Sequence, residues 1–391
     1  MAGSGEAIVV GAGIGGLAAA VGLRRAGWRV RVFERAATPG EVGAGISLWS
    51  NALAALAELR VGQAIRDAGT MQGSGGLRTP SGRWLSQASG AAIREHSDLS
   101  ILLVHRAELH RQLRDALPAD VITAGANVLA VNVDGTVQYT VDNERHETAA
   151  DLVVGADGLR SVVRQSLWPA TPQPRYAGFT AWRGVTEKPF ALAAQSETWG
   201  SGSEVGLTQL IDGRVYWFAT GNQPEGVRTG DEHAEALRRF GGWHEPIGDV
   251  IRATAPEAVL RHDIYQQPRP LSAFARGRVA LLGDAAHAIT PNLGQGACLA
   301  LEDAVVLAAE LTRTDDVPSA LRRYDAVRRP RAQRLSTTSH RLARMIQTRS
   351  PVVVGLRSAL AVVVPAKLGA AGLARRVAWT APVIDGTGTG R

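Results

Sequence analysis

The chain has 391 residues, of which 45% are hydrophobic, and its formal net charge is +7. This length exceeds one simple core and fits two domains or one elaborated domain. The single cysteine, Cys298, excludes an internal disulfide framework and a cysteine pair for redox or zinc chemistry, so we expect no metal site.

The first predicted unit is a strand, a glycine-rich turn, a helix and a second strand. An apolar run leads into the motif GAGIGG at 11–16, an amphipathic helix follows, and a second apolar run ends at Glu34. Gly11 allows a sharp turn, Gly13 lets the backbone approach a pyrophosphate, and Gly16 lets the helix pack closely on the sheet. The helix N-terminus attracts phosphates, and the terminal carboxylate can accept hydrogen bonds from ribose hydroxyls. The unit predicts an adenine dinucleotide site rather than a glycine-rich turn that binds nothing.

Apolar periodicity and turn residues predict the elements that follow. They are helices over 51–59 and from His105, short strands at 76–78 and 83–85, alternating strands within 121–141, and a buried strand at 151–154. The last strand ends in the tight turn Asp157-Gly158, which opens a helix. Ligands of open α/β sheets bind at the carboxyl ends of strands, so Asp157 is predicted over the same crevice as Gly11.

A second sheet is predicted in the middle of the chain. Residues 176–265 are rich in aromatic side chains, strand-like runs and hairpin turns, which indicates a mostly antiparallel sheet inserted in the chain. A buried strand at 278–282 follows and presents Asp284 at its end, over the same crevice. The loop at 291–296 then leads into a long alanine-rich helix over 296–311.

The C-terminal part contains an arginine-rich helix and a more apolar segment. We interpret the arginines, concentrated within 322–344, as a solvated helix face, because no aromatic stacking platform or DNA-binding motif accompanies them. Nucleic acid is therefore not an expected partner. Residues 352–384 are predicted to form one or two amphipathic helices that cap the sheet or pair subunits rather than touch a membrane. No apolar run is long enough to span a membrane and the N-terminus lacks a signal-peptide pattern, so we expect a cytoplasmic protein.

Together, the motifs at 11–16, 151–158 and 278–296, with the phrases at 104–109 and 176–184, resemble the group A flavoprotein monooxygenases of the para-hydroxybenzoate hydroxylase fold. The similarity covers roughly residues 7–336 and points to the branch that contains the salicylate and urate hydroxylases. It implies an α/β fold, in which a three-layer, FAD-binding Rossmann-like domain carries an inserted, mostly antiparallel β-sheet substrate domain and C-terminal helices. The expected bounds are 1–72, 101–175 and 266–345 for the FAD-binding domain, 73–100 and 176–265 for the substrate domain, and 346–391 for the C-terminal helical segment.

The resemblance also implies the cofactors and the residues that bind them. FAD is expected to bind non-covalently, with NADH or NADPH and O₂ as cosubstrates. Glu34 is expected on the adenosine ribose, Arg106 on the phosphate–ribityl side and Asp284 on the ribityl chain. The full set implied for cofactor binding is Gly11, Gly13, Ile14, Gly15, Gly16, Glu34, Arg35, Gly45, Arg106, Asp157, Gly158, Gly283, Asp284, Pro291, Gly294, Gln295 and Gly296.

The implied reaction is hydroxylation or epoxidation of an apolar aromatic or polycyclic small molecule through a flavin C4a-hydroperoxide, by a monomer or homodimer. Catalysis would be centred on the flavin, with Pro291 and His287 as candidates, although His287 is more simply a histidine that satisfies loop carbonyls. Glu204 stands where urate-type enzymes have an arginine, so no cationic anchor for an anionic ring is expected. The expected substrate pocket comprises Trp182, Glu204, Gln209, Tyr216, Trp217 and Pro291, unless the aromatic side chains simply form the core of the sheet.

Two other functions stay open at this point: a flavin-dependent reductase or dehydrogenase on the same fold, and a flavoprotein that sequesters a small molecule. A nicotinamide dehydrogenase would use the first motif but leave the motifs at 151–158 and 278–296 without a role. A disulfide reductase needs a cysteine pair, which the sequence lacks. Substrate-dependent consumption of NAD(P)H distinguishes an enzyme from a sequestering protein.

Overall fold

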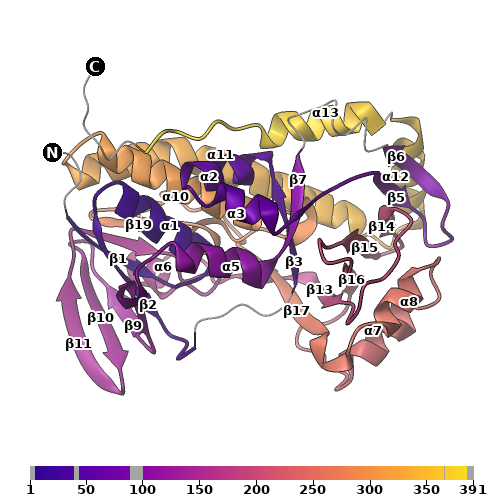
Figure 1. Ribbon diagram of the computed structural model, residues 1–391, viewed down its shortest axis with the longest axis horizontal. Helices are drawn as coiled ribbons and strands as arrows, with labels where there is room; N and C mark the ends of the chain where they lie inside the picture. The colour runs from indigo at the N-terminus through magenta and orange to yellow at the C-terminus, as the bar shows by residue number, and fades with distance from the viewer. Residues whose placement is uncertain (1–4, 39–43, 89–99, 365, 385–391) are drawn as a thin grey trace.

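The computed structural model describes residues 5–38, 44–88, 100–364 and 366–384. Two large sheets lie toward opposite ends of an elongated molecule, and the long helix α11 (Val317–Ile346) runs between them (Figure 1). The fold is mixed α/β, which confirms the predicted fold class. The domain bounds stay a prediction.

One end of the molecule is a six-stranded sheet built from the predicted apolar runs. β1 (Glu6–Val10) lies between β2 (Arg29–Glu34) and β12 (Leu152–Gly155), parallel to both. The order across the sheet is β18-β19-β12-β1-β2-β8, completed by β8 (Ile122–Ala124), β18 (Ala275–Arg276) and β19 (Val279–Leu281). Since β1, β12 and β19 are adjacent and parallel, their carboxyl ends open on one edge, and each of the three predicted motifs follows its strand there.

Helices and two small sheets surround this core. α1 (Ile14–Arg25) packs against α10 (Gly296–Thr312), which also contacts α11 and α2 (Ser50–Glu58). The other helices of this part are α3 (Gly62–Asp67), α5 (Arg106–Asp115), α6 (Val162–Leu167) and α9 (Asp284–His287). The small sheets are β3 (Gly45–Trp49), β7 (Ile101–His105) and β4 (Thr70–Met71), and β11 (Glu144–Ala149), β10 (Thr136–Val141) and β9 (Asn127–Val131). Gly43, which precedes the predicted Gly45 site, lies outside the described residues.

The other end is a seven-stranded sheet in the order β17-β13-β16-β15-β14-β5-β6. Its strands are β17 (Leu260–Gln266), β13 (Arg175–Val185), β16 (Val215–Asn222), β15 (Ser203–Gln209), β14 (Gln195–Trp199), β5 (Gly75–Arg78) and β6 (Trp84–Ala88). Side chains alternate along each strand, so the register divides them between two faces. One face packs on α7 (Glu232–Phe240) and α8 (Ile247–Arg252), helices that the sequence analysis did not predict.

The arginine-rich helix is α11, and its interpretation as a solvated face is wrong at Arg328. That side chain is 0% exposed and lies between α11 and α10, because two acidic side chains of α10 balance its charge. Beyond α11 follow α12 (Pro351–Val363) and α13 (Ala366–Val377), as the sequence predicted for this segment. No helix within the described ranges is long and apolar enough to cross a membrane.

Candidate cofactor and substrate site

The turn between β1 and α1 is open at one glycine and crowded at two others. Gly11 has φ +103°, and a Cβ there would lie 2.6 Å from the carbonyl oxygen of Ala156. A Cβ at Gly16 would clash with the carbonyl oxygen of Gly11. Gly13 has ordinary extended backbone, and a Cβ there would meet no atom within 4 Å. Gly13 therefore borders the space in which a ligand can approach the backbone, beside the N-terminus of α1, which has no side-chain cap.

Glu34 ends β2 with its carboxylate beside this turn. Its two oxygens accept hydrogen bonds from the N–H groups of Ala12, at 2.8 Å, and of Ala36, at 2.9 Å. The imidazole of His110, buried on α5, supports the same turn, with Nε2 2.8 Å from the carbonyl oxygen of Ala12. The sequence analysis missed this histidine, whose position on the apolar face of α5 was the available signal. Arg35, the next residue after Glu34, is exposed.

The remaining residues predicted around the first motif are inner parts of the scaffold. Ile14 is buried at the start of α1, and a Cβ at Gly15 would lie 2.8 Å from the side chain of Leu282. Arg106 is the first residue of α5, and its N–H donates to the Ala44 carbonyl at 2.8 Å. These contacts tie α1 and α5 to the strands that carry the crevice.

Asp157, two residues after β12, caps α6 with one carboxylate oxygen, and its other oxygen has no hydrogen-bond partner among the described residues. Its Oδ2 accepts hydrogen bonds from the N–H groups of Val162, at 2.6 Å, and Val163, at 3.1 Å. Its Oδ1 is buried and has no partner among the described residues. Burial raises the pKa of Asp157, against the opposing effect of these hydrogen bonds. Gly158 follows with φ +75° and open space where a Cβ would stand, so this turn offers a ligand one buried acceptor.

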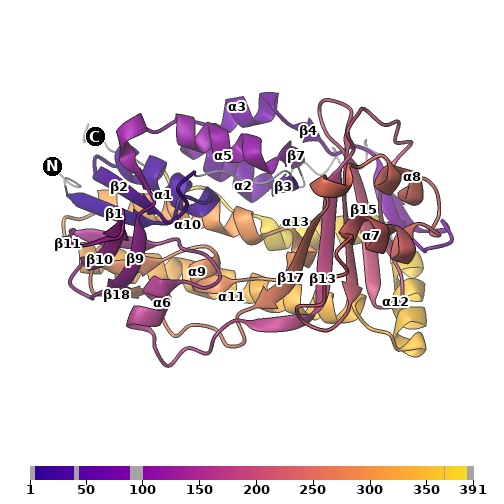
Figure 2. The ribbon, with the colours of Figure 1, turned by 90° about the horizontal axis from the view of Figure 1, so that it is seen from below.

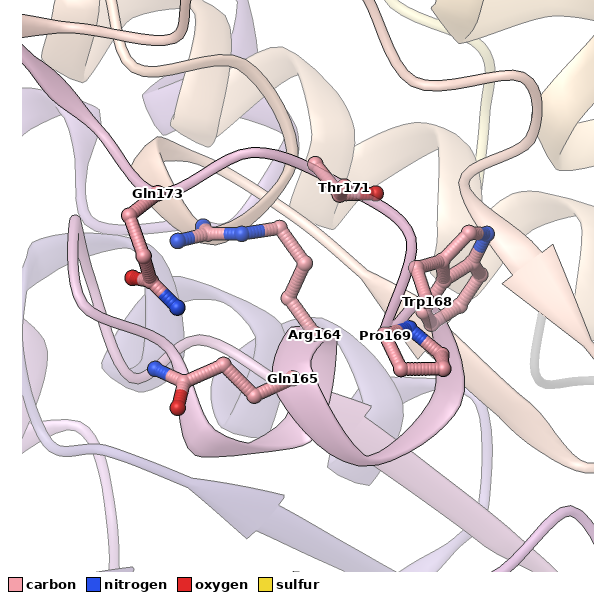
Figure 3. A pocket seen from close by; sticks show the side chains of 6 residues that line it. All are labelled: Arg164, Gln165, Trp168, Pro169, Thr171 and Gln173. Atoms are coloured by element: carbon pink, nitrogen blue, oxygen red, sulfur yellow. The ribbon is translucent and has the colours of Figure 1, made fainter.

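Arg164 links the second motif to the third. Its guanidinium donates to the carbonyl oxygens of Leu159, at 2.6 Å, and Ala285, at 2.8 Å. Burial lowers the pKa of Arg164, while the charges of Asp157 and Asp284 raise it. A cavity of about 140 Å³ beside α6 is lined by Arg164, Gln165, Trp168, Pro169, Thr171 and Gln173 (Figure 3). None of these six lining residues is among the predicted cofactor or substrate residues.

Gly283 and Asp284 follow β19 directly. Gly283 has φ +57°, and Asp284 is exposed at the first position of α9. His287 is buried, and its Nε2 lies 2.6 Å from Oδ2 of Asp303, which also accepts a hydrogen bond from the Gly283 N–H at 3.0 Å. The expectation that loop carbonyls satisfy His287 is therefore wrong, because a carboxylate of α10 holds it.

A group of buried charges lies between α10, α11 and α2. Arg328 donates to Asp303 at 2.7 Å and to Glu302 at 2.5 Å. Asn51 donates to Glu302 at 2.6 Å and to the side-chain oxygen of Gln295 at 2.9 Å. Burial alone would raise the pKa of Asp303, but the neighbouring histidine and Arg328 lower it to about 2. The sequence analysis missed this network, although two adjacent acidic residues in an apolar helix were the available signal.

The network supports the glycine-rich loop that precedes α10. Pro291–Leu293 forms one 3₁₀ turn, and Gly294 has φ +61°, with a Cβ there only 3.0 Å from Nε1 of Trp49. Gly296 begins α10, which has no side-chain cap at its N-terminus. Cys298 is buried and donates to the Gly294 carbonyl at 3.5 Å. Burial raises the pKa of its thiol to about 12, so the thiol is chemically inert here.

Glu204 joins the seven-stranded sheet to this loop. It is 2% exposed, and its Oε1 accepts hydrogen bonds from Asn292 at 3.0 Å and from Thr220 at 3.2 Å. The carboxyl group of Glu197 lies beside it on the adjacent strand β14. Burial, and then the Glu197 charge, raise the pKa of Glu204 well above its ordinary value.

Tyr216 lies on the same face as Glu204, whereas three other predicted pocket residues do not. The ring of Tyr216 packs on Gly45 of β3, where a Cβ would lie 2.5 Å away. Trp182 and Trp217 are 0% exposed in the core between the sheet and its two helices. Gln209 points to that helix-covered side as well, and its amide donates to the carbonyl oxygens of Phe190 and Gly213. The assignment of these three residues to the substrate pocket is therefore wrong, because the register turns them away from the loop.

FAD fits the features along this edge. The open space at Gly13 and the uncapped N-terminus of α1 suit a pyrophosphate, and the exposed carboxylate of Asp284 suits the hydroxyls of a ribityl chain. The uncapped N-terminus of α10 aims N–H groups at the same edge. The unpartnered buried oxygens, Oδ1 of Asp157 and Oδ1 of Asn292, are acceptors that donors of a ligand would satisfy.

Comparisons with known proteins agree with this fit. A family model described as an FAD binding domain matches residues 5–339. The chain is 40% identical over 358 residues to the aurachin C monooxygenase/isomerase of Stigmatella aurantiaca, covering 90% of this chain and 92% of that one. It is 38% identical over 344 residues to an FAD-dependent urate hydroxylase of Klebsiella pneumoniae, covering 84% and 87%. The crystal structure of Klebsiella pneumoniae HpxO with FAD and uric acid is similar with a TM-score of 0.87 and 33% identity, covering 95% and 96%.

Proposed function

Because the chain belongs to the FAD-binding-domain family of flavin monooxygenases, we propose that it hydroxylates or epoxidises an apolar aromatic ring whose polar group near the glycine-rich loop is uncharged. The enzyme is an oxidoreductase that uses FAD, with NAD(P)H and O₂ as cosubstrates. When bound, FAD supplies the transfer of electrons from NAD(P)H and the activation of O₂.

The residues of the chain would bind the FAD, orient it and shield it from water. Gly13 leaves room for the pyrophosphate, and Glu34 is held beside it as an acceptor for the ribose. Asp284 is the acceptor for the ribityl chain. Gly294 and the start of α10 would offer a bound flavin backbone N–H groups, which favour negative charge. The seven-stranded sheet contacts the other side through Glu204 on Asn292 and Tyr216 on Gly45, and it would shield a bound ring from water.

The proposed substrate class rests on one observation, the pair of acidic residues Glu197 and Glu204. Burial, and then the Glu197 charge, raise the pKa of Glu204 and so favour its uncharged form, while the charge of the buried Arg357 opposes this effect. Glu204 therefore offers no positive charge to an anionic ring at this end of the site. Arg183, which hydrogen-bonds to Tyr216, supplies positive charge at the other end of the face. The chain is 40% identical to the aurachin C enzyme and 38% identical to the urate enzyme. These two identities differ too little to indicate which of the two substrates resembles its own.

Incorporation of labelled oxygen tests the reaction. With ¹⁸O₂, NAD(P)H and a neutral bicyclic aromatic compound, we expect one labelled oxygen atom in the product and NAD(P)H oxidation that the substrate accelerates. Mass spectrometry of the product is the measurement. Turnover under anaerobic conditions with no label in any product would instead indicate a flavin-dependent reductase, and binding without NAD(P)H consumption would indicate a sequestering protein.

Replacing Glu204 by arginine tests the substrate class. A buried cation at this position would attract an anionic ring, so we expect Glu204→Arg to raise the NAD(P)H oxidation rate with urate or salicylate at least tenfold relative to neutral rings. Each tenfold change corresponds to about 1.4 kcal/mol. Gln209→Arg is the matched control, because it places the same charge on the same strand but on the opposite face. Equal responses of the two variants would refute the role of Glu204 in substrate selection.

A further inference from the structure

The burial pattern of α12 is the reverse of that of an ordinary surface helix, because a charged side chain is buried and the apolar side chains are exposed. Its one buried side chain is the charged Arg357, which is 4% exposed and donates to the carbonyl oxygens of Met345, at 2.8 Å, and Ile346, at 2.7 Å, and to that of Gly200. The large apolar side chains point outward instead. Between 352 and 364 the exposed ones are Val352 (78%), Val353 (40%), Leu356 (60%), Leu360 (53%), Val362 (54%), Val363 (75%) and Val364 (44%).

This apolar surface is concentrated in one place. Val352, Leu356, Leu360 and Val363 recur at helical spacing and form one stripe along α12. α12 stands at the end of the molecule, beyond the seven-stranded sheet, and contacts β6 (Figure 2). A monomeric water-soluble surface does not ordinarily carry so continuous an apolar patch, which marks an interaction site.

The charge of the surrounding segment identifies the partner. From Ala326 to Ile384 the sequence contains no aspartate or glutamate and eleven arginine and lysine residues. Of these, Arg328, Arg329 and Arg331 pair with carboxylates and Arg357 is buried. Arg341, Arg344 and Arg349, close to the start of α12 in the chain, are exposed and form no ion pair within the described ranges. An apolar stripe flanked by uncompensated positive charge complements an anionic lipid surface.

We propose that the stripe on α12 binds the surface of a bilayer that contains anionic lipids. A helix of 13 residues is about 20 Å long, shorter than the hydrocarbon core of about 30 Å, so it lies in the interface and does not cross it. A second copy of the chain fits less well, because a symmetric contact would place the same positive segment against itself. This proposal differs from the expectation that the segment caps the sheet or pairs subunits, and it does not depend on the identity of the substrate.

Flotation of the FAD-loaded full chain with vesicles tests this proposal. On vesicles of phosphatidylcholine with phosphatidylglycerol we expect at least tenfold more bound protein than on phosphatidylcholine alone, with binding that weakens as salt rises. The double substitution Leu356→Glu with Leu360→Glu should reduce binding at least tenfold. Because both side chains are exposed, the variant should keep its FAD and its melting temperature.

Ile211→Glu is the matched control, since Ile211 is 58% exposed in a hairpin of the seven-stranded sheet and should leave binding unchanged. Absence of binding to the anionic vesicles would overturn the proposal, as would equal binding to both kinds of vesicle. Light scattering identifies the competing occupant: a dimer that the double substitution dissociates, without any vesicle binding, would show that a second copy covers the stripe.

Discussion

Gly13→Val is expected to yield a folded protein that purifies without FAD. A Cβ at this position meets no protein atom within 4 Å, and the φ of −73° suits any residue, so the substitution leaves the apoprotein intact. The branched side chain instead occupies the space into which the pyrophosphate must fit. We expect FAD affinity to fall at least 100-fold, equivalent to about 2.8 kcal/mol. Titration followed by flavin fluorescence measures the affinity, and the thermal unfolding of the apoprotein measures the fold.

Gly16→Ala is the matched comparison three residues along the same turn. There the new Cβ would clash with the carbonyl oxygen of Gly11, so the protein itself must shift. We expect a loss of roughly 1–3 kcal/mol in the free energy of unfolding of the apoprotein, as in other overpacked positions. If Gly13→Val destabilised the apoprotein as much as Gly16→Ala does, or kept full FAD affinity, the open space at Gly13 would not be the pyrophosphate site.

Arg328→Met is expected to be the most destabilising single change in the core. The variant leaves the buried carboxylate of Asp303 without its arginine, which lies 2.7 Å away, and it leaves Glu302 paired with Arg331 alone, at 2.7 Å. Removing one partner of a buried ion pair costs about 3–5 kcal/mol, because the remaining charge stays out of water. Urea unfolding measures the change. Arg334→Met on the same helix is the control, since Arg334 is exposed, and it should change the free energy of unfolding by less than about 0.5 kcal/mol.

The same network predicts the pH dependence of stability. The pKa of Asp303 is lowered from 3.8 to about 2, so its contribution to stability is complete above pH 3.8 and is lost as the pH falls toward about 2. In Arg328→Met the carboxylate keeps only part of its compensating charge, so its pKa rises and acid unfolding should begin at a higher pH than in the wild type. Identical acid-unfolding midpoints in the two proteins would contradict the pairing of Arg328 with Asp303.

The sequence by itself determined the edge of the six-stranded sheet at which FAD is proposed to bind. Gly11, Gly16 and Glu34 act within one strand–turn–helix–strand unit, where chain geometry alone fixes which positions tolerate no side chain and where the carboxylate stands. The strands before Asp157 and Asp284 were likewise predictable, because strands buried on both faces read as short apolar runs. Parallel neighbours then bring their carboxyl ends to one edge without further information.

Only the tertiary structure decided the substrate face and the buried charges. Alternation along β15 and β16 separates Glu204 from Trp217, but it does not say which face the unpredicted helices α7 and α8 cover. The tryptophan-rich composition therefore predicted a substrate pocket, but these tryptophan side chains form the core between the sheet and its helices. Arg328 is distinguished from the exposed arginines of α11 solely by Glu302 and Asp303 on another helix. The burial of a charge depends on a partner distant in sequence, and no local pattern encodes that partner.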